Sequence, residues 1–393
     1  MQTPYYVGLD VHKKTVACCV KTAEGRIVQE ETVKSTRKDL VAWAQSLDRP
    51  WVGAMEATLF TGWIYDTLAP HARSLRVGHP AMMRAIAASK KKSDRLDAGK
   101  IADLVRCDLL PECYMAPREL RDLRRELRWR NFLVSVTTRL KNKSAGLLME
   151  CGVEYNKKRL HGKKYFESLV GNLTDVPPSL ERMLRFDRAT QELFTRTQKR
   201  LLGRLENDAR LRERVALLQT IRGVGQALAL TWVLEVGDPQ RFRSNRRAVS
   251  YCGLCSALSQ SGGKTFRGPI SKQRNKNLQV MLIEAAKIAP RWNPQLKAVH
   301  AREAARSNRN RATLAVARKL VAYLLFVDKN GKPFEPRGAE ATEEGAASES
   351  PGAAPGATAS GKGGKEKPAV SLMESARPAR EKTTTRAKGS SDR

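Results

Sequence analysis

A carboxylate inside an apolar stretch at the start of the chain constrains the fold more than any other feature. Asp10 lies within residues 5–11, YYVGLDV, which have the composition of a buried strand. Removing an unpaired carboxylate from water is costly, so such an acid normally has a metal ion or a basic group as its partner. The stretch therefore predicts a strand that carries an acid with a specific partner.

Three further acids stand in similar settings. Glu56 follows the apolar residues 51–55, and Asp94 and Asp97 follow the basic run Lys90-Lys91-Lys92. Asp94 and Asp97 are three residues apart and would share one face of a helix. Clustered carboxylate oxygens are what a pair of Mg²⁺ ions needs to assist phosphoryl transfer, and the lysines would face phosphates. The order of strand acid, strand acid and helix-start pair predicts a metal-dependent nuclease-like site.

Each acid also has a structural alternative. Asp10 would serve as a turn residue before His12, and Glu56 would end a strand at the surface. Asp94 and Asp97 would favour the N-terminus of a helix, where negative charge is stabilised. Taken singly, these alternatives are favoured; only the combination of four acids points to a site.

The charge of the chain indicates a polyanionic partner. Lys and Arg exceed Asp and Glu by 32 over 393 residues, and the basic residues are spread along the whole sequence. Because there is no amphipathic basic anchor at one end, nucleic acid is a better partner than a membrane. The seven cysteines are irregularly spaced, which favours free thiols. No signal peptide or membrane-spanning stretch is recognised, so we expect a soluble, cytoplasmic protein associated with the nucleoid.

Residues 1–112 have the pattern of a mixed α/β domain, because three strands are followed by alternating strands and helices. The expected strands are 5–11, 15–21, 26–33, 51–57 and 74–77. The expected helices are 37–47, 62–68, one that begins at Pro80, and 94–106.

The rest of the chain reads as helical. Residues 113–216 contain two long charged helices, over 118–149 and 180–216, with the leucine spacing of an antiparallel hairpin or coiled coil. They would form a dimerisation arm or nucleic-acid clamp, or simply two solvated helices. Residues 217–330 form a mostly helical domain. Residues 331–393 are a basic, low-complexity tail with few large apolar side chains, which predicts disorder.

A Gly-x-Gly turn marks the start of the third domain. Gly223 and Gly225, preceded by Arg222, have the spacing of a helix-hairpin-helix turn, whose backbone amides contact phosphates. An ordinary turn between helices is the alternative. Downstream, the Cys252-x-x-Cys255 pair has neither a second pair nor a nearby His, so it is interpreted as structural and not as a zinc site.

Ser261 is a candidate nucleophile. It directly precedes Gly262-Gly263, in a positive segment where its hydroxyl could attack a phosphodiester and hold one end as a phosphoserine. That covalent bond would preserve the energy needed for rejoining. A flexible basic loop is the alternative. The flanking basic residues, candidates for phosphate contact, are Lys264, Arg267, Lys272, Arg274 and Lys276.

Together these motifs resemble the insertion-sequence "one-ten" (IS110) transposases, which are bridge-RNA-guided recombinases. The N-terminal resemblance rests on VGLDVHK at 7–13, MEAT at 55–58 and KSDRLDAGKIA at 92–102. The C-terminal resemblance rests on IRGVG at 221–225, YCGL at 251–254, QSGGK at 260–264 and ISK at 270–272.

The resemblance implies a fold and a mechanism. The N-terminal domain would be an RNase-H/RuvC-like DEDD domain, with Asp10, Glu56, Asp94 and Asp97 as ligands of Mg²⁺ or Mn²⁺, and Ser261 would be the nucleophile of the C-terminal transposase domain. The partners implied are donor and target DNA, a noncoding guide (bridge) RNA, and further copies of the chain, as homodimers joined through the coiled coil and paired into a homotetramer. A composite active site would form across protomers. The rival interpretations are a Holliday-junction type endonuclease that uses water, and a non-catalytic nucleic-acid-binding protein.

Overall fold

The computed structural model describes residues 3–86 and 93–335. The first compact unit ends at Glu335. The three lysines predicted to face phosphates, Lys90, Lys91 and Lys92, lie outside the described residues, as does the predicted tail from Pro336 onward. Across the part of the chain that the structure describes, no helix is both long and apolar enough to cross a membrane.

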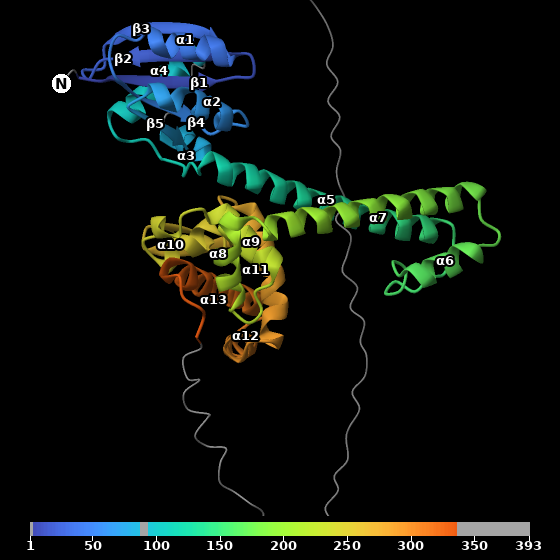
Figure 1. The fold of residues 1–393 in the computed structure, drawn as a ribbon. Coiled ribbons are helices and arrows are strands. Elements are labelled where there is room, and N and C mark those ends of the chain that lie inside the picture. The colour runs from blue at the N-terminus through green and yellow to red at the C-terminus, as the bar shows by residue number, and fades with distance from the viewer. Residues whose placement is uncertain (1–2, 87–92, 336–393) are drawn as a thin grey trace, which may run out of the picture. The chain divides into compact units, whose positions relative to one another are not determined.

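The N-terminal domain is built on one mixed sheet in the order β3-β2-β1-β4-β5, which confirms the predicted α/β class (Figure 1). Strands β1, β2 and β3 are antiparallel neighbours, whereas β4 and β5 run parallel to β1. The strands are β1 (Tyr5–Val11), β2 (Thr15–Lys21), β3 (Ile27–Lys34), β4 (Trp51–Glu56) and β5 (Ser74–Gly78). The helices of this domain are α1 (Arg37–Ser46), α2 (Thr61–Leu68), the 3₁₀ turn η1 (Ala69–His71), α3 (Pro80–Ile86) and α4 (Asp94–Arg106).

Helices cover both faces of this sheet, because the central strands are apolar on both sides. On one face, the odd-numbered residues of β1 pack with Leu40 and Trp43 of α1 and Ile64 of α2. On the other face lies α4, whose Ala98 packs on Cys19 of β2. The even-numbered residues of β1 face α4 because successive side chains of a strand alternate.

Gly8 sets the distance between β1 and α4. A Cβ atom on Gly8 would lie 1.9 Å from the carbonyl oxygen of Ala98 and 2.4 Å from the amide nitrogen of Ala102. Only a residue without a side chain allows this approach. Helix α4 begins at Asp94, where the Ser93 hydroxyl accepts a hydrogen bond from the Leu96 amide at 3.3 Å. Its first turn therefore lies beside Asp10, two residues beyond Gly8 on the same face of β1.

A helical hairpin, here called the arm, follows the sheet domain. Helices α5 (Arg118–Glu150) and α7 (Pro178–Glu206) pack along each other in opposite directions, and the short α6 (Lys163–Gly171) lies at their tip (Figure 1). The predicted helix over 180–216 is wrong in its length. The chain breaks at Asp208, whose carboxylate caps a new helix by accepting from the Arg210 amide at 3.0 Å.

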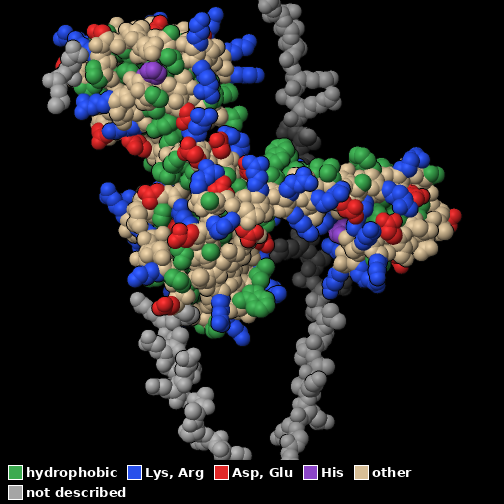
Figure 2. Space-filling view, in the orientation of Figure 1, with side chains coloured by type: hydrophobic (Ala, Val, Ile, Leu, Met, Phe, Trp, Pro, Cys, Tyr) green, Lys and Arg blue, Asp and Glu red, His purple; other side chains and the backbone are tan. Residues whose placement is uncertain are grey.

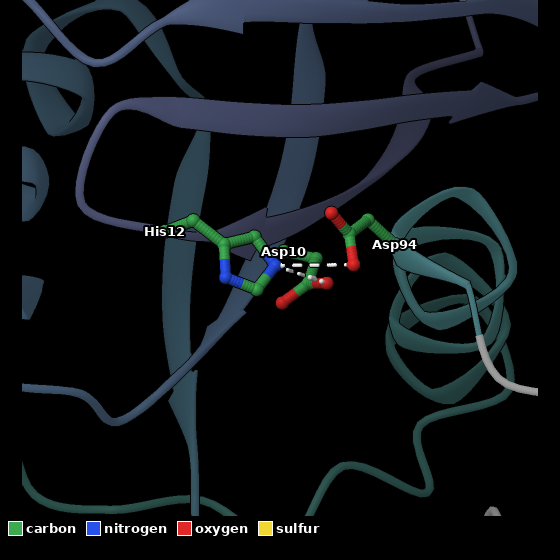
Figure 3. A group of neighbouring side chains, drawn as sticks. All are labelled: Asp10, His12 and Asp94. Carbon is green, nitrogen blue, oxygen red and sulfur yellow. Dashed lines mark hydrogen bonds and ion pairs between the residues drawn. The ribbon is translucent and has the colours of Figure 1, made fainter.

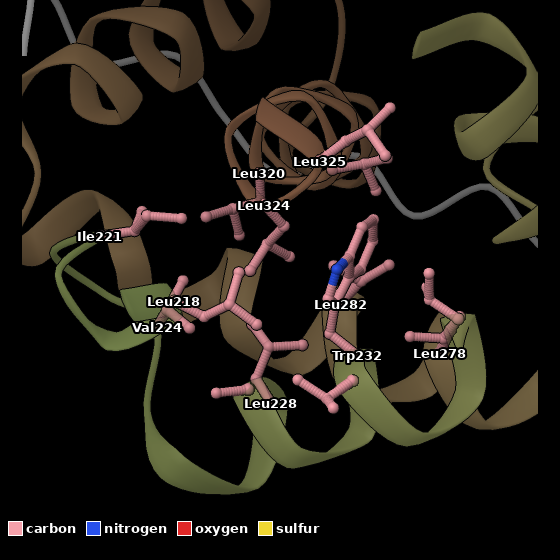
Figure 4. Packing of buried hydrophobic residues seen from close by; sticks show 14 of the residues in the cluster. Leu218, Ile221, Val224, Leu228, Trp232, Leu278, Leu282, Leu320, Leu324 and Leu325 are labelled. Carbon is pink, nitrogen blue, oxygen red and sulfur yellow. The ribbon is translucent and has the colours of Figure 1, made fainter. Parts of the chain in front are cut away.

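The C-terminal domain is a helical cluster around α9, whose residues from Leu228 to Val236 are all buried. Figure 4 shows leucines of α13 and α11 converging on Trp232 and Leu228 of α9. The helices are α8 (Ala209–Gln219), α9 (Gln226–Val236), η2 (Pro239–Arg241), α10 (Asn245–Tyr251), α11 (Lys276–Ile288), η3 (Ala289–Arg291), α12 (Pro294–Arg306) and α13 (Arg309–Asn330).

Two features of this domain differ from the sequence-based expectation. The flexible basic loop that was the alternative for the segment around Ser261 is wrong, because β6 (Ser256–Ser261) and β7 (Lys264–Ile270) form a hairpin there. The predicted disorder from residue 331 is also wrong for the first residues of that segment. The Phe334 ring packs on Tyr323 at 4.5 Å between centroids, and its amide donates to the Thr220 hydroxyl at 2.8 Å. One aromatic residue in a polar segment is enough to fix the chain there.

Candidate functional site

The structure brings the carboxylates of Asp10 and Asp94 together at one ring nitrogen of His12 (Figure 3). The His12 Nε2 atom lies 3.1 Å from the Asp10 carboxylate and 3.4 Å from the Asp94 carboxylate. One ligand atom from each of the three residues falls within 4.8 Å of the others. Asp10 comes from β1, His12 from the turn after it, and Asp94 from the start of α4, so the contact of α4 with β1 creates the cluster.

The Asp10 carboxylate is in an unfavourable position for a free anion. Its side chain is 14% exposed, whereas that of Asp94 is 64% exposed. Burial raises the pKa of Asp10 above its ordinary value; the nearby His12 opposes this, and the negative charges of Asp94 and Asp97 raise it further. A divalent cation between these carboxylates would relieve the repulsion and the cost of burial.

The other two predicted ligands are close in the fold but outside this cluster. Asp97 lies one turn along α4, and its carboxylate accepts from the Lys100 ammonium at 3.1 Å. Glu56 is the last residue of β4. Leu9 of β1 pairs with Met55 of the parallel strand β4, so Asp10 and Glu56, one residue further along each strand, are neighbours on adjacent strands. The Glu56 carboxylate is half-buried and has no hydrogen bond or ion pair with another described residue.

This arrangement suits a hard divalent cation. Carboxylate oxygens are the ligands that Mg²⁺ prefers, and Mn²⁺ also accepts an imidazole nitrogen. Asp10 and Asp94 are the two carboxylates that the structure places close enough to share an ion. Sequence reasoning missed His12 as a member of the group. Its signal was the spacing of two residues from Asp10, which directs both side chains to one face of an extended chain.

Ser261 occupies the last position of β6, at the tip of the hairpin. The turn consists of Gly262 and Gly263, with φ of +54° and +76°. Two consecutive positive φ angles are characteristic of a type I′ turn, in which glycine avoids the steric cost that other residues incur. Ser261 pairs with Lys264 across the turn, and both side chains are exposed. The structure thus presents the candidate nucleophile to solvent beside a cation.

The other basic residues predicted to contact phosphate differ in how exposed their side chains are to solvent. Lys264, Lys272 and Lys276 are exposed. Arg274 is half-buried: its stem packs over Gly253, and its Nη1 donates to the Ser271 carbonyl at 3.3 Å. The side chain of Arg267 lies outside the described part of the structure.

The Gly-x-Gly turn joins α8 to α9, a place that fits both a helix-hairpin-helix turn and an ordinary turn between helices. Arg222 is exposed, and Gly225 is exposed at the start of α9. Gly223 has a structural role as well, because a Cβ atom on it would lie 2.7 Å from that of Ala289. The Val224 amide donates to Ile221 at 2.9 Å and is therefore not free for a phosphate.

The cysteine pair does not form a metal site within the described residues. Cys252 is buried, Cys255 is half-buried, and both are free thiols, as are the other five cysteines. Burial raises the pKa of Cys252 to about 12, which keeps the thiol protonated.

The segment that leaves the serine hairpin is anchored to a buried acid that the sequence did not reveal. Glu235 of α9 has a fully buried side chain. Its carboxylate accepts hydrogen bonds from the side-chain amides of Asn275 and Asn277, each at 2.9 Å. The Asn275 side chain also caps α11, accepting from the Leu278 amide at 3.2 Å. Glu235 therefore fixes the point at which the chain passes from the hairpin into the helical core.

Comparisons with known proteins match both halves of the chain. Residues 7–152 match the DEDD transposase domain of the IS110 type, and residues 215–301 match the domain described as Transposase IS116/IS110/IS902 family. The chain is 27% identical to the transposase of insertion sequence element IS1111A from Coxiella burnetii, over 72% of this chain and 76% of that protein. It is 24% identical to the transposase of IS1328 from Yersinia enterocolitica, over 61% of this chain and 71% of that protein. A third similar protein, from Sinorhizobium fredii, is a putative transposase, 25% identical over 53% of this chain and 50% of its own length.

Proposed function

The chain belongs to the IS110/IS116/IS902 family of transposases, and on this premise we propose that it excises and inserts an insertion sequence by cutting and rejoining DNA through a phosphoserine. The observation that carries the proposal is the meeting of Asp10 and Asp94 across the β1–α4 contact. Two carboxylates brought together from separate elements, one of them mostly buried, have a clear chemical use when a cation joins them.

The metal centre would consist of Asp10, Glu56, Asp94 and Asp97, with Mg²⁺ or Mn²⁺ as the ion. Bound there, a divalent ion would polarise a phosphate oxygen and lower the pKa of the attacking hydroxyl. The residues of the chain would orient the phosphodiester. Exposed Lys264 would neutralise charge that develops on the phosphate beside Ser261.

In the proposed strand exchange, the Ser261 oxygen attacks phosphorus and gives up its proton, while one ester bond of the DNA backbone breaks and releases a hydroxyl end. A hydroxyl end of another strand then attacks the phosphoserine, restores a phosphodiester and returns the proton to Ser261. The number of ester bonds is conserved, so no external energy source is required. Ser261 and the carboxylates belong to different domains, and we propose that they assemble into a composite site across protomers.

The remaining partners are also part of the proposal. Donor and target DNA would be paired with a noncoding guide RNA, and the net charge of +32 supports contact with this much polyanion. The arm would join two copies of the chain into a dimer, and two dimers into a tetramer. In support, the arm exposes a stripe of apolar side chains at near-heptad spacing on α7: Met183, Phe186 and Leu193.

The test is a denaturing gel of the full-length protein after incubation with Mg²⁺, end-labelled element-junction DNA and RNA expressed from the element. We expect a labelled protein–DNA adduct that is lost in Ser261→Ala and retained in Ser259→Ala, a matched change on the same strand. An adduct that persists in Ser261→Ala would refute the serine assignment.

The main rival is a nuclease that uses water. Free cut DNA without any adduct, still dependent on metal and on Asp10, would establish that rival. Full DNA binding and full excision in cells by Asp10→Asn would instead remove the catalytic role of the carboxylates.

A further inference from the structure

The serine hairpin carries an exposed aromatic ring on the same face as Ser261. Ser261 pairs directly with Lys264, and Phe266 stands two residues beyond Lys264 on β7. Directly paired residues project to one face of a hairpin, and so do residues two apart on a strand. Gln260 and Thr265 lie on the opposite face, where the Gln260 side-chain amide donates to the Thr265 hydroxyl at 2.9 Å. Ser261, Lys264 and Phe266 therefore share one face.

The Phe266 ring is largely exposed to solvent. It is 70% exposed, while the phenylalanine of the helical core, Phe242, is 5% exposed. The ring is therefore available to contact a molecule outside the chain, and its surroundings decide which kind.

The charge around the ring selects the class of partner. From Ser256 to Lys276 the sequence contains five basic residues and no acid. On the visible face in Figure 2, by contrast, Asp and Glu side chains are interspersed with Lys and Arg over the described parts of the molecule. An acid-free basic segment with an aromatic ring is the combination with which proteins bind unpaired nucleic acid, because cations contact the backbone and the ring stacks on a base.

We propose that Phe266 stacks on an unpaired base next to the phosphate that Ser261 attacks, and so holds the DNA strand open and in register at the cutting point. The inference rests on the proposed function. Strand exchange requires the paired bases at the crossover to separate, and a ring that occupies the place of a neighbouring base lowers the cost of that separation. Phe266 is thus a substrate-positioning residue, while Lys264 contacts the backbone regardless of pairing.

The experiment compares the affinity of the full-length protein for two fluorescent DNA duplexes that differ only in a short unpaired bubble. We expect the protein to prefer the bubble. Phe266→Ala should lose roughly 5- to 100-fold in affinity for the bubble, with little change for the paired duplex. Phe266→Trp should keep the preference, and Phe266→Leu should keep little of it, because an aliphatic side chain has no ring to stack.

Two controls separate stacking from other effects. Leu258→Ala removes the exposed apolar side chain of the opposite face and should leave the preference unchanged. Lys264→Gln should weaken binding to both duplexes equally and reduce the dependence of binding on salt. In addition, 5-iodouracil placed in the bubble should photo-crosslink to the peptide that contains Phe266.

The outcomes are decisive in both directions. Equal affinity of the unmodified protein for both duplexes, or an unchanged preference in Phe266→Ala, would overturn the inference. If Phe266→Ala instead lowered the mass of the assembly in light scattering without changing the preference, the ring would be a protein–protein contact. Because the binding assay needs no strand cutting, failure of the phosphoserine test leaves this result interpretable.

Discussion

The Arg128 guanidinium of α5 donates two parallel hydrogen bonds to the buried Glu235 carboxylate of α9, from Nε to Oε1 and from Nη2 to Oε2, both at 2.8 Å. The pair joins the arm to the core of the C-terminal domain. Through Asn275 and Asn277, the same carboxylate holds the segment that leaves the serine hairpin. One buried acid thus connects the proposed dimerisation element with the hairpin that carries the proposed nucleophile.

Removing Arg128 should be costly. In Arg128→Ala, Glu235 keeps its two amide donors but loses its closest cation, and we expect a loss of about 3 kcal/mol in the free energy of unfolding. Urea denaturation measures it. The control is Arg125→Ala on the same helix, whose exposed pair with Asp122 is 2.9 Å long and should contribute less than about 1 kcal/mol. Equal losses in the two variants would contradict the role assigned to Glu235.

The same carboxylate should make stability depend on acid pH. Burial raises the pKa of Glu235, but the hydrogen bonds and charge of Arg128, with the Asn275 amide, outweigh it, so the pKa lies below its ordinary value. A lowered folded-state pKa adds stability that is fully present above the unfolded-state pKa, about 4.3, and is lost as the pH falls through the folded-state pKa.

Comparison with Glu235→Gln isolates this effect. The difference in unfolding free energy between the unmodified protein and Glu235→Gln should be constant from neutral pH down to about pH 5 and should then shrink. A difference that stays flat below that pH would show that Glu235 does not titrate with folding.

Gly8→Ala tests the contact that builds the carboxylate cluster. The added methyl group would overlap the Ala98 carbonyl oxygen, so α4 must move away from β1 and take Asp94 with it. We expect a lower melting temperature and a weaker stabilisation by Mg²⁺. The matched control is Gly146→Ala in α5, where a Cβ atom has no neighbour within 4 Å; it should stabilise by about 0.5–1 kcal/mol because glycine disfavours helix interiors. Unchanged Mg²⁺ stabilisation in Gly8→Ala would argue against the proposed ligands.

Asp10→Asn should have opposite effects on stability without and with metal. Without a divalent ion, removing a mostly buried charge that Asp94 and Asp97 repel should raise the melting temperature slightly. With Mg²⁺ or Mn²⁺, the unmodified protein should gain stability by mass action, and Asp10→Asn should not. Differential scanning fluorimetry across a metal titration measures both, with Asp122→Asn as an exposed control. A metal-induced shift that survives in Asp10→Asn would place the ion elsewhere.

Much of the N-terminal domain is predictable because its patterns are local. Helix α4 begins and ends where the sequence predicted, since Ser93 caps it and its acids lie in the first turn. The family resemblance is confirmed by the two matched domains.

The β6–β7 hairpin was missed because its residues are polar and do not alternate, although Gly262-Gly263 is a known hairpin signal. The break before α8 was missed because leucine spacing continues on both sides of Asp208.

By itself, the sequence determined the strands and helices of the sheet domain, the identity of the family and the acids that are candidates for a metal. These depend on composition, spacing and motifs within short windows. Only the tertiary structure decided that Asp10 and Asp94 meet at the His12 ring, that Glu235 anchors the end of the serine hairpin, and that Phe266 shares a face with Ser261. The spacing of Asp10 and His12 is local, but their contact with Asp94 requires α4 to pack on β1. The other two relationships require helix packing and strand pairing, and local sequence patterns do not specify which segments meet.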